Sequence, residues 1–110
     1  MITWEDFEKI EMRVGTILEV NDFPKARKPA YQFLVDFGGD IGVKRSSAQL
    51  TVHYKKEELV NRQVIAVVNF PPKQIGSFIS ECLILGVYDE NNDVILLAPE
   101  RTVKNGMKIG

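Results

Sequence analysis

Basic and polar side chains gather in three short segments of the sequence, and their types suit RNA binding. Lysine and arginine neutralise phosphates, whereas asparagine, glutamine and serine hydrogen-bond to base edges and to the ribose 2′-OH. The candidate RNA-binding residues are Lys44, Arg45, Ser46, Asn69, Lys73, Gln74 and Ser80. They stand at the ends of predicted strands, so we expect them to converge on one side of the fold.

The same segments also carry apolar side chains of a kind that binds polypeptide. The candidate peptide-binding groove contains Phe70, Pro71, Pro72, Ile75 and Phe78, with Ser47 and Gln49 from the preceding segment. Apolar patches rimmed by polar groups mark protein-binding sites. The alternative is structural: Phe70 and Phe78 would close one end of a barrel while the polar residues cap turns.

Catalytic chemistry has little support in this sequence. His53 is the only histidine and is expected at the surface, and Cys82 opens an apolar run, which is typical of a buried thiol. One cysteine excludes an internal disulfide, and one histidine leaves too few ligands for a Cys/His zinc site. No glycine-rich phosphate loop is present. We therefore expect neither an enzyme nor a cofactor nor a metal site.

The charges are distributed unevenly along a chain of net charge −1. Residues 1–22 hold two basic and six acidic side chains, residues 23–74 hold nine and four, and residues 75–110 hold three and five. A mixed solvated surface explains these counts, and so does a basic face directed at a polyanion.

The segment Asn69–Glu81 is predicted to be the loop that presents many of these residues. Two adjacent prolines cannot donate to a sheet ladder, so we expect a loop between strands at 64–69 and 81–88. Before it, the alternation and turn signals predict a helix at 4–10, strands at 11–21, 31–37 and 41–45, a polar segment at 46–50 and a helical connector within 51–62. After it, we expect a strand at 94–98 and an extended piece near 107–109.

About five main strands with a helical connector between the third and the fourth predict an all-β fold with short helices. The architecture that fits is one five-stranded OB-type barrel over residues 1–110, with an N-terminal helix and a C-terminal extension. Gly15, inside the first strand, suits the bend or bulge that a strand shared across a small barrel requires.

Two features favour a homodimer. The runs 64–68 and 83–87 are apolar on both faces, although the outside of an exposed barrel strand should be polar. The N-terminal helix carries large apolar groups; packing on the core is the default expectation, and a subunit interface is the alternative. The predicted interface residues are Trp4, Phe7, Leu83 and Leu85.

No apolar run approaches the roughly 20 residues that span a bilayer, and the acidic N-terminus does not resemble a signal peptide. We expect a cytoplasmic protein without membrane insertion.

Four segments resemble the tRNA-binding OB domain that occurs alone or fused to methionyl- and phenylalanyl-tRNA synthetases. They are Glu11–Ile17, Phe23–Arg27, Val35–Gly38 and Val64–Phe70. The resemblance covers nearly the whole chain and implies an OB fold and tRNA binding by the candidate residues named above.

Within this family, the chain is most similar to the stand-alone CsaA subgroup of secretion-associated chaperones. The similar segments are Ser46–Gln49, Asn69–Phe78, Ser80–Gly86 and Lys108–Gly110. This likeness implies a homodimer that binds unfolded or exported precursor polypeptides without ATP.

Two segments depart from the pattern of the tRNA-binding members. Ser80–Leu83 replaces a Ser-x-Gly-Met-like segment, and Arg45–Gln49 replaces a Val-Ser/Thr-Gly-Leu-like turn. The resemblance thus favours a chaperone, with a tRNA-binding module on the same surface as the alternative.

Overall fold

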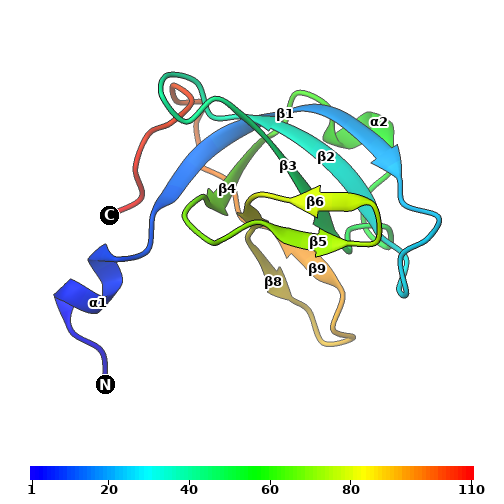
Figure 1. Cartoon of the computed structure of the whole chain (residues 1–110), viewed down its shortest axis with the longest axis horizontal. Helices are drawn as coiled ribbons and strands as arrows, with labels where there is room; N and C mark the ends of the chain where they lie inside the picture. Colours follow the sequence, from blue (N-terminus) through cyan, green and yellow to red (C-terminus); the bar gives the residue numbers. More distant parts are fainter.

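The computed structural model describes all 110 residues as one small barrel with short appended elements (Figure 1). The elements are α1 Trp4–Glu8, β1 Met12–Asp22, β2 Tyr31–Asp36, β3 Val43–Ala48, α2 Lys56–Leu59, β4 Gln63–Val67, β5 Lys73–Ile75, β6 Phe78–Ser80, β7 Leu83–Ile84, β8 Gly86–Tyr88 and β9 Val94–Leu96. Five strands form the main sheet, in the order β3-β2-β1-β4-β7, and β5–β6 and β8–β9 form separate hairpins. No helix is long and apolar enough to cross a membrane.

Strand β1 is the shared strand of the barrel, as predicted. Its first half pairs with β4 from Met12 to Thr16, and its second half pairs with β2 from Thr16 to Asp22. The register shifts between Ile17 and Glu19, so the bulge lies just beyond Gly15. Gly15 itself permits a close approach, since a Cβ there would stand 2.7 Å from side-chain atoms of both Phe37 and Val35.

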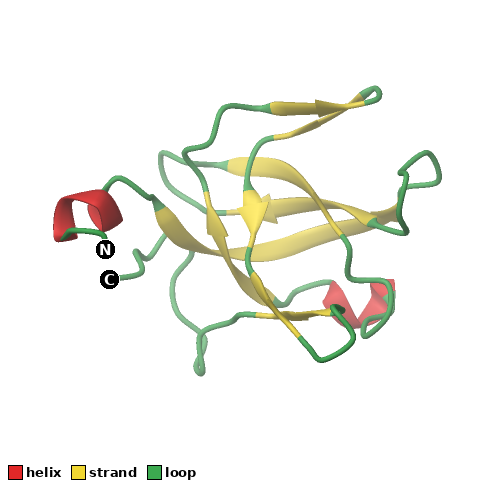
Figure 2. Ribbon diagram, turned by 90° about the horizontal axis from the view of Figure 1, so that it is seen from below, coloured by secondary structure: helices red, strands yellow, loops and turns green.

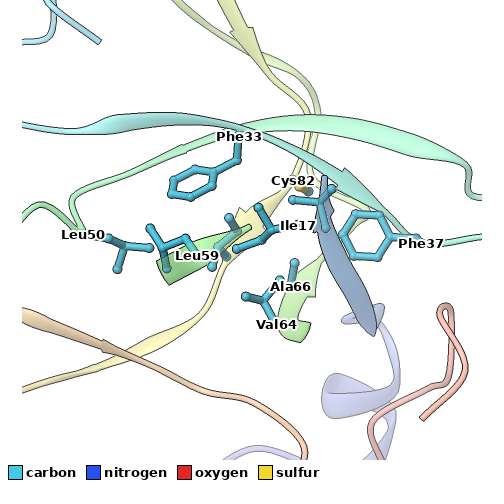
Figure 3. Close-up of a cluster of buried hydrophobic side chains, with 10 residues drawn as sticks. Ile17, Phe33, Phe37, Leu50, Leu59, Val64, Ala66 and Cys82 are labelled. Atoms are coloured by element: carbon cyan, nitrogen blue, oxygen red, sulfur yellow. The ribbon is translucent and has the colours of Figure 1, made fainter. Parts of the chain in front are cut away.

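The core fills the barrel with the alternating side chains that the sequence predicts (Figure 3). Phe33, Val35 and Phe37 project from one face of the second predicted strand and are all buried. Two leucines, Leu50 and Leu59, enter the core from the connector between β3 and β4. Burying a side chain of this size contributes about 1.5–3 kcal/mol, so these residues dominate the stability of the barrel.

The barrel closes where the two edge strands of the main sheet meet. The Glu81 backbone N–H donates to the Arg45 carbonyl at 2.7 Å, and the Ser46 hydroxyl donates to the Cys82 carbonyl at 2.8 Å. We call this contact between β3 and the residues entering β7 the β3–β7 closure. It confirms the predicted five-stranded OB-type barrel.

Strand β3 extends farther than the sequence suggested. The residues 46–48 were expected in a polar segment after the strand, yet they pair with β2 as far as Ala48. Small hydroxyl side chains have weak strand propensity, but pairing with β2 and the buried bond of Ser46 compensate for it.

The segments around the two prolines also differ from expectation. Residues 69–81 contain the hairpin β5–β6, in which Gly76 adopts φ +62° at the turn. The predicted strand at 81–88 divides at Leu85, so that β7 pairs with β4 while β8 pairs with β9. The prolines correctly predicted that the strand before them ends, but they gave no indication of the short strands β5 and β6 that follow.

Helix α1 projects away from the barrel (Figures 1 and 2). Its capping box is present, because the Thr3 hydroxyl accepts from the Asp6 N–H and the Asp6 carboxylate accepts from the Thr3 N–H. None of its side chains is buried, and Trp4 is 79% exposed. The expectation that this helix packs on the core of its own chain is therefore wrong.

The C-terminal segment runs beside the start of β1. The Met107 carbonyl accepts from the Val14 N–H at 3.0 Å, and the Ile109 N–H donates to the Met12 carbonyl at 3.1 Å. This pairing confirms the extended piece predicted near residues 107–109 and brings Gly110 beside α1.

We expect Gly15→Ala to lower the free energy of unfolding by about 1–3 kcal/mol, because the added methyl group would overlap two buried side chains. Urea denaturation measures the change. Gly110→Ala is the control, since nothing lies within 4 Å of its Cβ position. Equal stability of the two variants would contradict the close approach at Gly15.

Candidate polypeptide and nucleic-acid interface

The hairpin β5–β6 is the platform of the candidate site. It pairs Lys73 with Ser80 and Ile75 with Phe78, and β6 lies against β3 (Figure 1). The side chain of Gln74 donates to the Gly76 carbonyl at 3.0 Å and braces the turn. Strands β3, β5 and β6, which carry most of the predicted site residues, are thereby brought side by side.

An aromatic and charged stack connects the hairpin to the barrel. The rings of Phe23 and Phe78 lie 5.4 Å apart, and the Arg45 guanidinium lies 6.0 Å from the centroid of the Phe78 ring. Beyond Arg45 stands Glu81, whose Oε1 accepts from the Arg45 backbone N–H at 3.0 Å and from Arg45 Nε at 3.4 Å. We refer to Phe23, Phe78, Arg45 and Glu81 as the stack.

The Glu81 carboxylate is kept ionised by its surroundings. The hydrogen bond from the Arg45 backbone lowers its pKa most, and the charges of Arg45 and Lys44 lower the pKa further against the opposing effect of burial. The face consequently holds one stable negative charge among basic side chains.

The predicted groove residues are mostly at the surface. Phe70 is 55% exposed, Phe78 is half-buried against Phe23, and Ser47 is half-buried on β3. Ile75 is also half-buried, and the remaining groove residues are exposed; they are Pro71, Pro72 and Gln49. The alternative that both phenylalanines close the end of a barrel fits Phe78 in part, and does not fit Phe70.

The predicted RNA-binding residues divide into two sets. Lys73, Gln74 and Arg45 are exposed, and Lys44 and Ser80 are half-buried. Ser46 does not reach the surface at all, because its hydroxyl serves the β3–β7 closure. Ser46 has an exposed fraction of 0%, so its hydroxyl cannot contact RNA and the prediction for this residue is wrong.

Asn69 has a structural partner that the sequence did not suggest. Its Oδ1 accepts from the Glu11 N–H at 3.0 Å, and its Nδ2 donates to the Lys9 carbonyl at 2.7 Å. The side chain thus fixes the junction of α1 and β1 at the base of the candidate loop. It remains exposed, so a ligand contact stays a prediction.

The predicted dimer residues lie on two separate surfaces. The rings of Trp4 and Phe7 meet edge to face, with 6.3 Å between their centroids. Together with Ile2, Thr3 and Gly110 they line an open hollow of about 600 Å³. Leu83 is 47% exposed on β7, and Leu85 is half-buried. Within the apolar run 83–87, Ile84 is buried in the core, whereas Leu83 and Val87 are exposed and have no cover within their own chain.

Two features of the site region were missed at the level of sequence. Phe23 is absent from the candidate residues named above, although it is a buried partner of Phe78. His53 pairs with Asp89 at 2.7 Å, and with Asp93 these side chains offer three potential metal ligands within 4.8 Å. The pKa of Asp89 is lowered chiefly by the Asp93 backbone N–H and by His53. The acidic turn after β8 was the only signal for this cluster.

Cys82 is buried, as predicted, and burial raises the pKa of its thiol to about 11. A thiol with this pKa is almost entirely protonated at neutral pH, so it is a poor nucleophile.

The model of the family described as "Putative tRNA binding domain" matches residues 12–108 of this chain. The chain belongs to this tRNA-binding-domain family. Among curated relatives, "Methionine--tRNA ligase" of Pyrococcus furiosus is 41% identical over 108 residues, covering 98% of this chain and 14% of the relative. The chain thus spans about one-seventh of that enzyme.

Two solved structures of the family match the whole fold. The chaperone CsaA of Picrophilus torridus is 55% identical, with a TM-score of 0.94 and 100% of both chains covered. The chaperone CsaA of Bacillus anthracis str. Ames is 45% identical, with a TM-score of 0.93, covering 100% of this chain and 99% of the other. These likenesses confirm the family resemblance drawn from the sequence motifs.

We expect Ser46→Ala to destabilise the tRNA-binding-domain barrel by about 1–2 kcal/mol, because the Cys82 carbonyl would lose its shortest donor in a buried place. Ser47→Ala, the change at the neighbouring half-buried residue, should shift stability by less than about 0.5 kcal/mol. Thermal unfolding of the two variants makes the comparison. A larger loss in the Ser47 variant would mean that the closure does not depend on this hydroxyl.

Proposed function

We propose that this protein is a CsaA-like molecular chaperone that binds unfolded or precursor polypeptides, in a role related to protein export. The proposal rests on the exposed aromatic and proline surface at Phe70–Pro72, which leads directly into the β5–β6 hairpin that carries the half-buried Phe78. The likeness to the two CsaA chaperones over the whole chain supports it. The sequence has no nucleotide-binding motif, so binding would be passive and independent of ATP.

The physical properties of this surface suit an extended polypeptide. Prolines restrict the backbone, so ordering the loop around a ligand costs less entropy. Phe70 supplies apolar area, and Ser47 and Gln49, farther along the end of β3, would offer hydrogen bonds to the peptide backbone. A chain of mixed apolar and polar residues would find both kinds of contact.

We expect Phe70→Ala to weaken binding of a reduced, carboxymethylated model polypeptide about fivefold, because the exposed apolar area of its ring is lost. Fluorescence anisotropy of the labelled polypeptide gives the dissociation constant. Tyr88→Ala is the matched control, since Tyr88 is an exposed aromatic residue on the separate β8–β9 hairpin. If both variants bind the polypeptide as tightly as the original protein, the assignment of the binding surface to Phe70–Pro72 is wrong.

The chaperone would act as a homodimer. The exposed Trp4, the half-buried Phe7 and the exposed Leu83 are apolar groups that a second subunit would cover. A dimer would supply the cover that α1 does not give to its own barrel, and it would explain the two-sided apolar strand at β7.

We expect sedimentation velocity at micromolar concentration to give a mass of two 12.5 kDa chains. Trp4→Ala should raise the dimer dissociation constant at least about tenfold, since a central tryptophan is a typical hot spot. Val52→Ala, at an exposed residue of the connector, should leave the constant unchanged. A monomer in the original protein would refute the dimer.

A tRNA-binding module using the same face is the second candidate function. The family model supports it, as do the basic side chains of Lys44 and Lys73 next to the polar Gln74 and Ser80, whereas the predicted Arg45 is paired with Glu81. Phosphates would contact the basic groups, and bases would contact the polar ones.

We expect Lys44→Glu combined with Lys73→Glu to lower tRNA affinity more than about tenfold and to reduce the dependence of log K on log salt by about 2. Filter binding at several salt concentrations measures both quantities. Lys104→Glu with Lys108→Glu gives the same change of net charge on exposed residues near the C-terminus. An equal loss of tRNA affinity in the two double variants would show that only the net charge of the protein matters.

A further inference from the structure

The acidic member of the stack is the one charge of this face that neither candidate function uses. Glu81 lies among basic residues that are predicted to bind RNA. The charges of Lys44 and Arg45 act on its carboxylate, and Lys73 pairs with Ser80, the residue next to Glu81 in the chain. A carboxylate in this place repels phosphate groups.

Glu81 has little freedom to move away from its neighbours. Its backbone N–H donates to the Arg45 carbonyl at 2.7 Å, and its Oε1 accepts from the Arg45 N–H at 3.0 Å. The residue is thus held to β3 by both its main chain and its side chain. The carboxylate is 31% exposed, so it is partly shielded from solvent.

The position of Arg45 follows from this arrangement. Its Nε lies 3.4 Å from Glu81 Oε1, and its guanidinium lies 6.0 Å from the Phe78 centroid. A guanidinium that is paired with a carboxylate and placed over an aromatic ring has less charge to offer a phosphate. It also occupies a ring face on which a base would otherwise stack.

We propose that Glu81 is the specificity-determining residue of this surface: by pairing with Arg45 over Phe78, it disfavours RNA and leaves the surface to polypeptides. The inference rests on the proposed function in one respect, namely that polypeptide and RNA would bind this same face. It assigns polypeptide as the preferred ligand class.

The decisive variant is Glu81→Gln, in which the side-chain carbonyl can still accept from the Arg45 backbone N–H while the negative charge is lost. Affinity for bulk tRNA should rise about fivefold at low salt, and the slope of log K against log salt should steepen by about 1, since one more basic group becomes available. Affinity for the carboxymethylated polypeptide should not fall more than twofold. Glu90→Gln, at an exposed turn residue, gives the same net charge and should leave tRNA binding within twofold.

Arg45→Gln tests whether Glu81 acts through this arginine. Alone it should change tRNA affinity by less than about twofold, because Glu81 already offsets the charge of Arg45. Combined with Glu81→Gln it should remove most of the gain, which is the non-additivity expected of paired residues. The single Arg45 variant also tests the proposal if Glu81→Gln fails to fold.

Three outcomes would overturn the proposal: unchanged tRNA affinity in folded Glu81→Gln, an equal gain in Glu90→Gln, or a large loss of tRNA binding in Arg45→Gln alone. These outcomes concern RNA only. Failure of the chaperone function would appear separately, as polypeptide binding that Phe70→Ala does not affect.

Discussion

The barrel depends on the contact by which its two edge strands meet. Each of the other neighbouring strand pairs in the main sheet has a ladder of at least two paired residues, whereas β3 meets the chain entering β7 through a few individual hydrogen bonds. The Ser46 hydroxyl and the Glu81 main chain supply two of them. The same residues adjoin Arg45 and Phe78, so the part of the fold that closes the barrel also shapes its candidate binding face.

The strands and the core could be predicted because burial imposes a period of two on the sequence. Phe33, Val35 and Phe37 alternate with polar or less buried neighbours, and no other arrangement places all three inside. Ser46 was misplaced for the opposite reason. Serine is common in loops, and the burial of Ser46 is favourable only because its hydroxyl donates to the Cys82 carbonyl, 36 positions away in the chain.

The exposure of several candidate residues was predictable from the sequence, but the contacts between them were not. Side-chain types at strand ends indicated Phe70, Lys73 and Arg45 correctly as surface residues. The contact of Phe23 with Phe78 joins residues far apart in the chain, and local sequence contains no trace of it. The helix α1 was misjudged because its amphipathic pattern shows only that an apolar face needs cover, not which chain provides it.

The burial of Cys82 has a consequence for how motion of the barrel can be observed. Its thiol points at the Arg45 carbonyl at 3.8 Å, within the β3–β7 closure, and its high pKa suppresses the thiolate while the barrel stays shut. Alkylation of the only cysteine can therefore proceed no faster than these strands separate. The chain carries an intrinsic reporter of local unfolding at its weakest junction, and ligand binding on the adjacent face should be visible as a slower rate of modification.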